Sequence, residues 1–435
     1  MPIPMIVQAR LVAATATLAC TAAIASAQII AITGGTVYPV SGPKIENGTV
    51  LIRDGKIIAV GASIAIPADA QRVDARGKWV TRGFINGATT LGLSEAGGPE
   101  FSGGYNDTRA KGEAGIAASF DAWRGINPRN TFIIPARQEG VTSVVVAPQG
   151  GMIAGRAAVV DLLDAQSPSE MLRANGVAMT GSFGAPDGAV ANARGEYWTK
   201  WASLIADVKA YADNRRAYDS ARTRAFITSR EQLEALIPVA RGRLPLLVSV
   251  DRATDILAAI DFAKTSGVRL WIEGGAEAWM VAKELAAAKI PVFTGAMNDI
   301  PTDFATLGQR QENASLLHAA GVSVVLIGNG PGDPSAFNVR NIRQEAGNAV
   351  AYGMSWEAAL RAITLTPAEV MGLDGSVGSL QPGRDANVVV WSGDPFEFAS
   401  VAEQVFVRGK TSMAKSRQQQ LTERYLSLPP AYHRP

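Results

Sequence analysis

The chain has 435 residues, of which 47% are hydrophobic and 18% are charged, and its net charge at pH 7 is +2. This length and composition are sufficient for a large buried core. The balanced charge gives no indication of a nucleic-acid partner or of binding to an anionic membrane surface.

The N-terminus has the pattern of a signal peptide. Arg10 is followed by an apolar, alanine-rich run from Leu11 to Ile24, and then by a small-x-small cleavage site that ends at Ala27. We therefore expect the mature chain to begin at Gln28 and to be periplasmic or secreted. Cys20, the only cysteine, would be removed, which leaves no thiol for a disulfide, a metal ligand or a nucleophile.

Two other interpretations of this segment are less consistent with its residues. An uncleaved membrane anchor requires a longer and more apolar run than Leu11 to Ile24. Lipoprotein cleavage at Cys20 would require an aliphatic residue at the position of Thr17.

The next part of the chain is predicted to be a small β-sandwich. Its β-rich segments are Ile29–Thr33, Thr36–Val40, Thr49–Arg53 and Lys56–Val60. Asp54-Gly55 separates the last two segments and is a strong signal for a two-residue hairpin turn.

From Gly83 to about Leu373, apolar runs alternate with helical patterns. The runs are Gly83–Ile85, Thr142–Ala147, Leu246–Val250, Arg269–Ile272, Pro291–Thr294 and Val322–Ile327. The helical patterns are Asp251–Ser266, Ala276–Lys289 and Asn313–Ala320. This alternation predicts an α/β fold, with a (β/α)8 TIM-like barrel as its most economical form. A longer helical and aromatic segment, Glu196–Arg230, is predicted to be an insertion over the barrel mouth.

After the barrel, the residues from Gly375 to Arg408 return to β-rich patterns. The predicted organisation is a signal peptide at 1–27, a discontinuous β-sandwich at 28–82 and 375–411, a barrel at 83–374, and a C-terminal tail at 412–435. The tail is polar, and no function is assigned to it.

Two motifs at the ends of the barrel resemble one protein family. Gly77–Leu93 reads GKWVTRGFINGATTLGL, and Gly378–Val390 reads GSLQPGRDANVVV. They resemble GK-x-V-x-PG-L/F-ID-x-H-x-HLG and GSLEPGKDADLVV of the amidohydrolase superfamily, in its imidazolonepropionase-like and dipeptidase-like branch. The resemblance implies a barrel with a folded-back β-sandwich. It also implies a hydrolase of carbon–nitrogen bonds that uses Zn²⁺ or another divalent metal to activate water.

The same resemblance indicates that the metal ligands of the family are missing. The first motif has Asn86, Ala88 and Thr90 where the family has an aspartate and two histidines. LVSVDRATDI resembles LVHAHRADDI and has Ser249 and Asp251 at the histidine positions, and LWIEGGAEA resembles LVLEHGTEA with Gly274 in place of histidine. The proton-shuttling aspartate of the family falls at Asn329 or Gly330. Because the whole chain has two histidines, no fold can build a site of several histidines, and we expect no metal and no other cofactor.

Three carboxylates remain as weak catalytic candidates, namely Asp251, Glu273 and Asp333. Oxygen ligands can hold Mg²⁺ or Ca²⁺. The simpler interpretation of Asp251 is a cap of the following helix. Glu273 is expected either to pair with an arginine or to bind a substrate amine. His318 is predicted on the outside of the barrel and His433 lies in a proline-rich tail, so neither is assigned a role.

One loop resembles the family branch in full. Ala147–Ala158 reads APQGGMIAGRAA, similar to PSGGVIAGQGA, and contains the candidate ligand-binding residues Gly150, Gly151 and Arg156. A pocket wall and a tight turn explain the glycines equally well.

These observations predict an exported amidohydrolase-like protein that is catalytically inactive or impaired. It would partner an intact amidohydrolase paralogue, or form a homo-oligomer, or bind peptide-like or cyclic amide ligands. The alternative is an active hydrolase of cyclic or other non-peptide C–N bonds, with carboxylate ligands or a site completed by a partner chain. Once the signal is cleaved, no membrane span is expected.

Overall fold

The computed structural model describes residues 28–95, 106–183, 191, 193–297, 300–301, 303–328, 336–412 and 414–426. The predictions for the signal peptide and for Asn329, Gly330, Asp333 and His433 lie outside these residues. Within the described ranges, no helix has the length and apolar character needed to cross a membrane.

The first and last parts of the chain form one mixed sheet. The strands are β1 Ile29–Tyr38, β2 Ile45–Arg53, β3 Lys56–Gly61, β4 Gln71–Asp74, β5 Trp79–Arg82, β14 Val388–Trp391, β15 Ala402–Val407 and β16 Lys410–Thr411. Their order is β16-β15-β14-β5-β1-β2-β3, with β4 paired to β1. The antiparallel pair β5–β14 joins the two parts of the chain. The predicted hairpin between β2 and β3 is present, with Asp54 and Gly55 both at positive φ.

A second sheet forms the barrel. Its strands are β6 Phe84–Thr89, β7 Val141–Val146, β8 Ile153–Asp161, β9 Leu172–Ser182, β10 Leu246–Val250, β11 Leu270–Gly274, β12 Val292–Thr294 and β13 Val324–Leu326. They follow one another around the sheet in sequence order. Strand β8 is antiparallel to both neighbours, whereas the other pairs are parallel. The predicted TIM-like α/β barrel is therefore confirmed, with one reversed strand among its eight.

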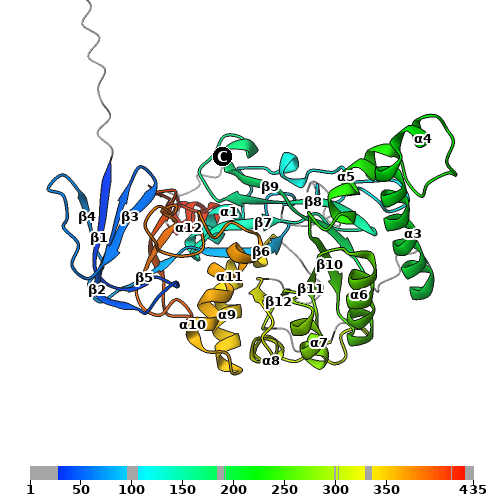
Figure 1. The fold of residues 1–435 in the computed structure, drawn as a ribbon. Helices are drawn as coiled ribbons and strands as arrows, with labels where there is room; N and C mark the ends of the chain where they lie inside the picture. The colour runs from blue at the N-terminus through cyan, green and yellow to red at the C-terminus, as the bar shows by residue number, and fades with distance from the viewer. Residues whose placement is uncertain are drawn as a thin grey trace, which may run out of the picture.

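Helices surround the barrel, and Figure 1 shows β1–β4 at one end of the molecule and α3 at the other. The helices, with η marking 3-10 turns, are η1 Ala122–Gly125, α1 Ile133–Gln138, α2 Pro168–Met171, α3 Arg194–Asp213, α4 Arg215–Asp219, α5 Arg230–Ala240, α6 Ala253–Ser266, η2 Ala278–Val281, α7 Ala282–Ala287, α8 Asn313–Ala319, η3 Asn338–Asn341, α9 Ile342–Ala351, α10 Trp356–Ala362, α11 Leu365–Val370 and α12 Arg417–Leu426.

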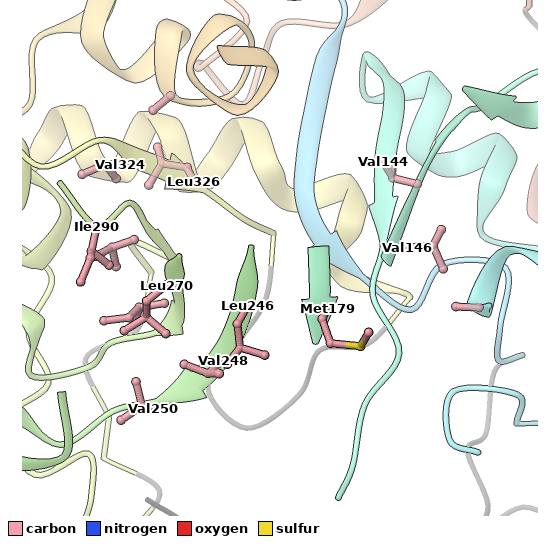
Figure 2. Packing of buried hydrophobic residues seen from close by; sticks show 14 of the residues in the cluster. Val144, Val146, Met179, Leu246, Val248, Val250, Leu270, Ile290, Val324 and Leu326 are labelled. Atoms are coloured by element: carbon pink, nitrogen blue, oxygen red, sulfur yellow. The ribbon is translucent and has the colours of Figure 1, made fainter. Parts of the chain in front are cut away.

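Alternation along the strands separates two apolar layers. Leu246, Val248 and Val250 of β10 belong to the large core between the barrel and its helices, part of which Figure 2 shows. Leu247, between them, belongs to a different cluster that fills the barrel interior. Every barrel strand contributes to this interior cluster through Ala88, Val145, Ala157, Val159, Ala178, Leu247, Trp271, Phe293 and Val325. The barrel is thus a packed core, and its chemistry is confined to the strand ends.

Helix α3 of the predicted insertion begins beside the barrel mouth but runs along the outside of the barrel, not across the mouth. In the first half of α3, Trp201 donates from Nε1 to the carbonyl of Ser182, at the carboxyl end of β9 (3.2 Å). In the second half, Lys209 donates from Nζ to the carbonyl of Ser266, at the end of α6 (2.7 Å). The helix therefore spans the outside of the barrel. Its buried residues include Tyr197, Trp201, Leu204, Val208 and Tyr211, whose helical spacing forms one packing face.

A buried charge network joins the barrel to the terminal sheet. Asp161, with no exposed surface, accepts hydrogen bonds from Ser143 Oγ (2.6 Å), Arg173 Nη2 (2.5 Å) and Arg408 Nε (2.6 Å). Arg173 also pairs with Asp385 (2.6 Å), which lies within the second family-like motif. Because its members come from both sheets, the network fixes their relative position.

Candidate functional site at the carboxyl ends of the strands

Strand register brings three polar residues into one row at the barrel mouth. Ser249 of β10 is directly beside Ser182 of β9 and Glu273 of β11. Ser249 and Glu273 come two residues after Leu247 and Trp271, which fill the barrel interior, so both point inward above that apolar layer. Ser249 is exposed, so solvent reaches this row.

The carboxylate of Asp251 fills the space beside Gly274. A Cβ atom built on Gly274 would lie 2.6 Å from Asp251 Oδ1, and Gly274 has a φ of +87°. Oδ1 also accepts a hydrogen bond from the backbone N–H of Ala276 (3.1 Å). The position at which the family resemblance expects a histidine therefore has a backbone conformation that favours glycine, and a side chain there would require the carboxylate of Asp251 to move.

Asp251 does not cap helix α6, which corrects the simpler interpretation of this residue. The N-cap position of α6 is Arg252, and it makes no side-chain cap hydrogen bond. Glu277 supplies the cap from outside the helix, since its Oε2 accepts from the backbone N–H of Ala253 (2.9 Å). The carboxylate of Asp251 instead accepts a hydrogen bond from the loop after β11.

Two neighbouring carboxyl groups at the mouth have raised pKa values. Burial, and after it the charge of Asp251, raises the pKa of Glu273 to about 7. Burial also raises the pKa of Asp251 to about 6; the charges of Asp303 and Glu277 add to this rise, and the N–H groups of Ala276 and Gly275 oppose it. Both residues keep some exposed surface.

No described Lys or Arg forms an ion pair with Glu273 or Asp251. The sequence of 96–105, 184–190 and 329–335 contains no Lys, Arg or His, so these segments cannot supply a counter-ion. Of the two sequence-based alternatives for Glu273, the arginine pair is therefore absent from the described part of the chain. The raised pKa of Glu273 is the expected result of a carboxyl group without a cation.

The side chains on β6 do not fit a metal. Asn86 is fully buried, and its Oδ1 accepts from the backbone N–H of Ala88 (3.2 Å). Ala88 is part of the apolar interior, and Thr90 is 3% exposed. Across the described residues, no three His, Cys, Asp or Glu side chains cluster closely enough to hold an ion. The metal centre that the family resemblance implies therefore has no matching donor set among these residues.

The loop after β7 is tightly packed. Gly150 and Gly151 have φ values of +86° and +69°, and a Cβ on Gly151 would lie 2.6 Å from the carbonyl oxygen of Gly115. Arg156, on β8, is held in an ion pair with Asp121 (2.9 Å). The glycines thus allow close approach of the chain's own backbone, and Arg156 has a structural partner.

Two residues near the mouth were missed by the sequence analysis. The side chain of Arg109 passes over Gly150, with Nε 2.8 Å from the point where a Cβ would stand, and Arg109 is exposed. Glu345 of α9 is 2% exposed and accepts from the N–H groups of Ala296 (2.5 Å) and Met297 (2.8 Å), just after β12. Burial raises the pKa of Glu345 to about 7, against these two hydrogen bonds. Neither residue belongs to a recognisable motif, so only the fold brings them to the mouth.

Of the two histidines, the structure describes His318 alone, and this residue contributes nothing to the mouth. His318 is exposed in the last turn of α8, on the outside of the barrel, as expected. His433 lies outside the described residues.

Comparisons with known proteins agree with this architecture. The model of the amidohydrolase family matches residues 138–412. An imidazolonepropionase from Acidiphilium cryptum (strain JF-5) is 24% identical over 382 residues, which cover 81% of this chain and 89% of the relative. The crystal structure of an amidohydrolase from Thermotoga maritima MSB8 has a TM-score of 0.78 and 29% identity, and the match covers 88% of this chain and 99% of that one.

A further relative matches only a short part of this chain. Amidohydrolase tasK from Hapsidospora irregularis is 29% identical over 94 residues, and this chain spans only 9% of its length. Because the family model covers more than half of the sequence, the chain belongs to the amidohydrolase family.

Proposed function

We propose that this chain is an exported amidohydrolase-family protein that binds a peptide-like ligand at its barrel mouth and lacks the metal-dependent hydrolysis of its family. The observation that carries the proposal is the pair Asp251–Gly274. A carboxylate there occupies the space of an expected histidine, and the glycine beside it has no room for a side chain. This arrangement is a repacked site and not one that a single substitution would restore.

The chemistry of the mouth favours a ligand with an amine. Glu273 comes two residues after Trp271 in β11 and pairs in register with Phe293 of β12, and the rings of Trp271 and Phe293 stack with centroids 5.6 Å apart, so Glu273 has apolar neighbours. An ammonium group placed between Glu273 and Asp251 would supply the missing positive charge and lower the pKa of both carboxyl groups. An exposed serine, Ser249, is next to them in register and can hydrogen-bond a peptide group.

The ligand is tested by calorimetry on the full purified chain with Ala-Ala and with N-acetyl-Ala-Ala, which lacks the free amine. We expect Ala-Ala to bind at least tenfold more tightly, and Glu273→Gln to remove this preference. His318→Gln, on the outer surface, is the matched control and should leave it intact. Equal affinity for both peptides in the wild type, or an unchanged preference in Glu273→Gln, would contradict the proposal.

The alternative is an active hydrolase in which Asp251, Glu273 and Asp333 hold a metal or exchange protons. The raised pKa values of Glu273 and Asp251 favour it, because a carboxyl group that titrates near neutrality suits general acid catalysis. Elemental analysis separates the two functions. Stoichiometric divalent metal that disappears in Asp251→Ala/Glu273→Ala, together with turnover of a cyclic amide, would establish the hydrolase.

Export and partnership are parts of the proposal with their own tests. N-terminal sequencing of protein from the periplasmic fraction should find Gln28 as the first residue. Co-expression with an amidohydrolase paralogue encoded by a neighbouring reading frame, with its histidine pair intact, should yield a stable complex. If the co-expressed chain purifies only as a homo-oligomer and the paralogue purifies separately, the partnership is contradicted.

A further inference from the structure

A cavity of about 430 Å³ lies at the end of the barrel opposite to the candidate site. It opens between α6 and α7, where residues 268–270 lead into β11 and residues 288–290 lead toward β12. Glu273 and Asp251 are at the carboxyl ends of β11 and β10, so the cavity belongs to a different face of the barrel. Its volume is within the range of small-molecule pockets, which is about 300–1,000 Å³.

The cavity combines an apolar wall with cationic side chains. Ile260, Val268, Leu270 and Ile290 form much of the wall, and the last three are about 5% exposed or less. Lys264, Arg269 and Lys289 are the charged residues of the lining, and all three are exposed. No Asp or Glu belongs to the lining of this cavity.

The three cations are not neutralised by described carboxylates. None of them takes part in an ion pair or a side-chain hydrogen bond with another described residue. Like charges held at one opening repel one another, and an anion at that opening removes the repulsion. The helix dipoles favour Lys264 in the last turn of α6 and Lys289 just after the C-cap of α7, but they do not place three cations at one apolar opening.

Lys289 is also held in an unusual backbone conformation. Its φ is +54°, in the left-handed region, directly after α7, where glycine is the favoured residue. A lysine at this position costs about 1 kcal/mol of backbone strain relative to glycine. Binding of an anion by the Lys289 cation would account for a lysine at this strained position.

We propose that this cavity is a binding site for a small amphipathic carboxylate, with the apolar body against Leu270 and Ile290 and the carboxylate at Lys264, Arg269 and Lys289. An apolar wall buries the hydrocarbon part of such a ligand, and the guanidinium of Arg269 can bind both carboxylate oxygens. The site is independent of the barrel mouth and of any hydrolytic activity.

The proposal is tested by calorimetry on the full chain with octanoate, 1-octanol and octylammonium as probes. We expect octanoate to bind at one site per chain, at least tenfold more tightly than octanol, and octylammonium not to bind. Weak, non-saturating heats, or octanol binding as tightly as octanoate, would overturn the assignment.

Variants separate binding from folding. Lys289→Gly removes a cation and relieves the positive φ, so the melting temperature should hold or rise while octanoate affinity falls at least threefold. The double variant Lys264→Gln/Lys289→Gly should lower the octanoate affinity at least tenfold. Lys283→Gln removes an exposed charge of α7 outside the lining and should leave it unchanged. Ala263→Phe, which fills the cavity, should abolish binding of both octanoate and octanol. Full affinity in the double variant would overturn the proposal.

Discussion

Asp251 Oδ1 lies 2.6 Å from the point at which a Cβ atom on Gly274 would stand. Gly274 ends β11 and pairs in register with Val250, the last residue of β10. Asp251 is the next residue after Val250. The glycine and the carboxylate therefore depend on each other: a side chain at position 274 requires the carboxylate to leave. A histidine at position 274 would therefore meet both a steric and a backbone obstacle.

Gly274→Ala is expected to lower the free energy of unfolding by about 2–4 kcal/mol, because it combines a positive φ with a clash. In the background of Asp251→Ala, the same change should cost about 1 kcal/mol, the conformational part alone. Urea denaturation of the four proteins of this cycle measures the coupling. Strictly additive costs would show that the carboxylate does not occupy the space beside Gly274.

Glu273→Gln should alter the pH dependence of stability. Burial and the charge of Asp251 raise the pKa of Glu273 from 4.5 to about 7, so the folded state favours the protonated form. The contribution is complete below pH 4.5 and is lost as the pH rises through 7. Between pH 5 and pH 8, the free energy of unfolding of the wild type should fall by about 1–3 kcal/mol more than that of Glu273→Gln.

The measurement is a series of urea denaturation curves across that pH range. Glu345 acts in the same direction, because burial raises its pKa to about 7, so part of the slope should persist in Glu273→Gln. Adding Glu345→Gln should flatten it further. A wild type that becomes more stable relative to Glu273→Gln above pH 7 would contradict the expected sign.

Glu345→Ala should be more harmful than Glu345→Gln. The N–H groups of Ala296 and Met297 both donate to the same oxygen, Oε2, so a glutamine oxygen can preserve both hydrogen bonds. Alanine leaves them without an acceptor at a residue that is 2% exposed, at a cost of about 2–4 kcal/mol. Thermal or chemical denaturation of both variants measures the difference, and equal losses would argue against the hydrogen bonds as the cause.

Asp161→Asn should be strongly destabilising, by about 3–5 kcal/mol, because it removes a fully buried charge that pairs with both Arg173 and Arg408 and leaves Arg173 with Asp385 alone. Asp213→Asn is the matched control. Asp213 pairs with Arg241, but both side chains are largely exposed, so its loss should stay within about 1 kcal/mol. Chemical denaturation compares the two, and a mild Asp161→Asn would mean that the network does not hold the sheets together.

Much of the architecture was predictable because it depends on local patterns. Asp54-Gly55 predicted a hairpin, and alternating apolar and helical runs predicted the barrel. The reversed direction of β8 was not predictable, since Ile153–Asp161 has the same composition as a parallel strand. The aromatic stripe on α3 was misassigned for a related reason: its spacing shows that one face is buried, but not which neighbour buries it.

The sequence by itself determined the family-like frame, because residue types at fixed motif spacings need no coordinates. It also predicted which residues stand at the metal positions of the family. It could not determine where the carboxylate of Asp251 turns, which depends on the backbone of Gly274 and on the N–H of Ala276 in a loop 25 residues away. The sequence also did not predict that Glu345 lies at the end of β12, or that Lys264, Arg269 and Lys289 line one cavity. These relationships arise from contacts between distant segments, and only the tertiary structure brings such segments together.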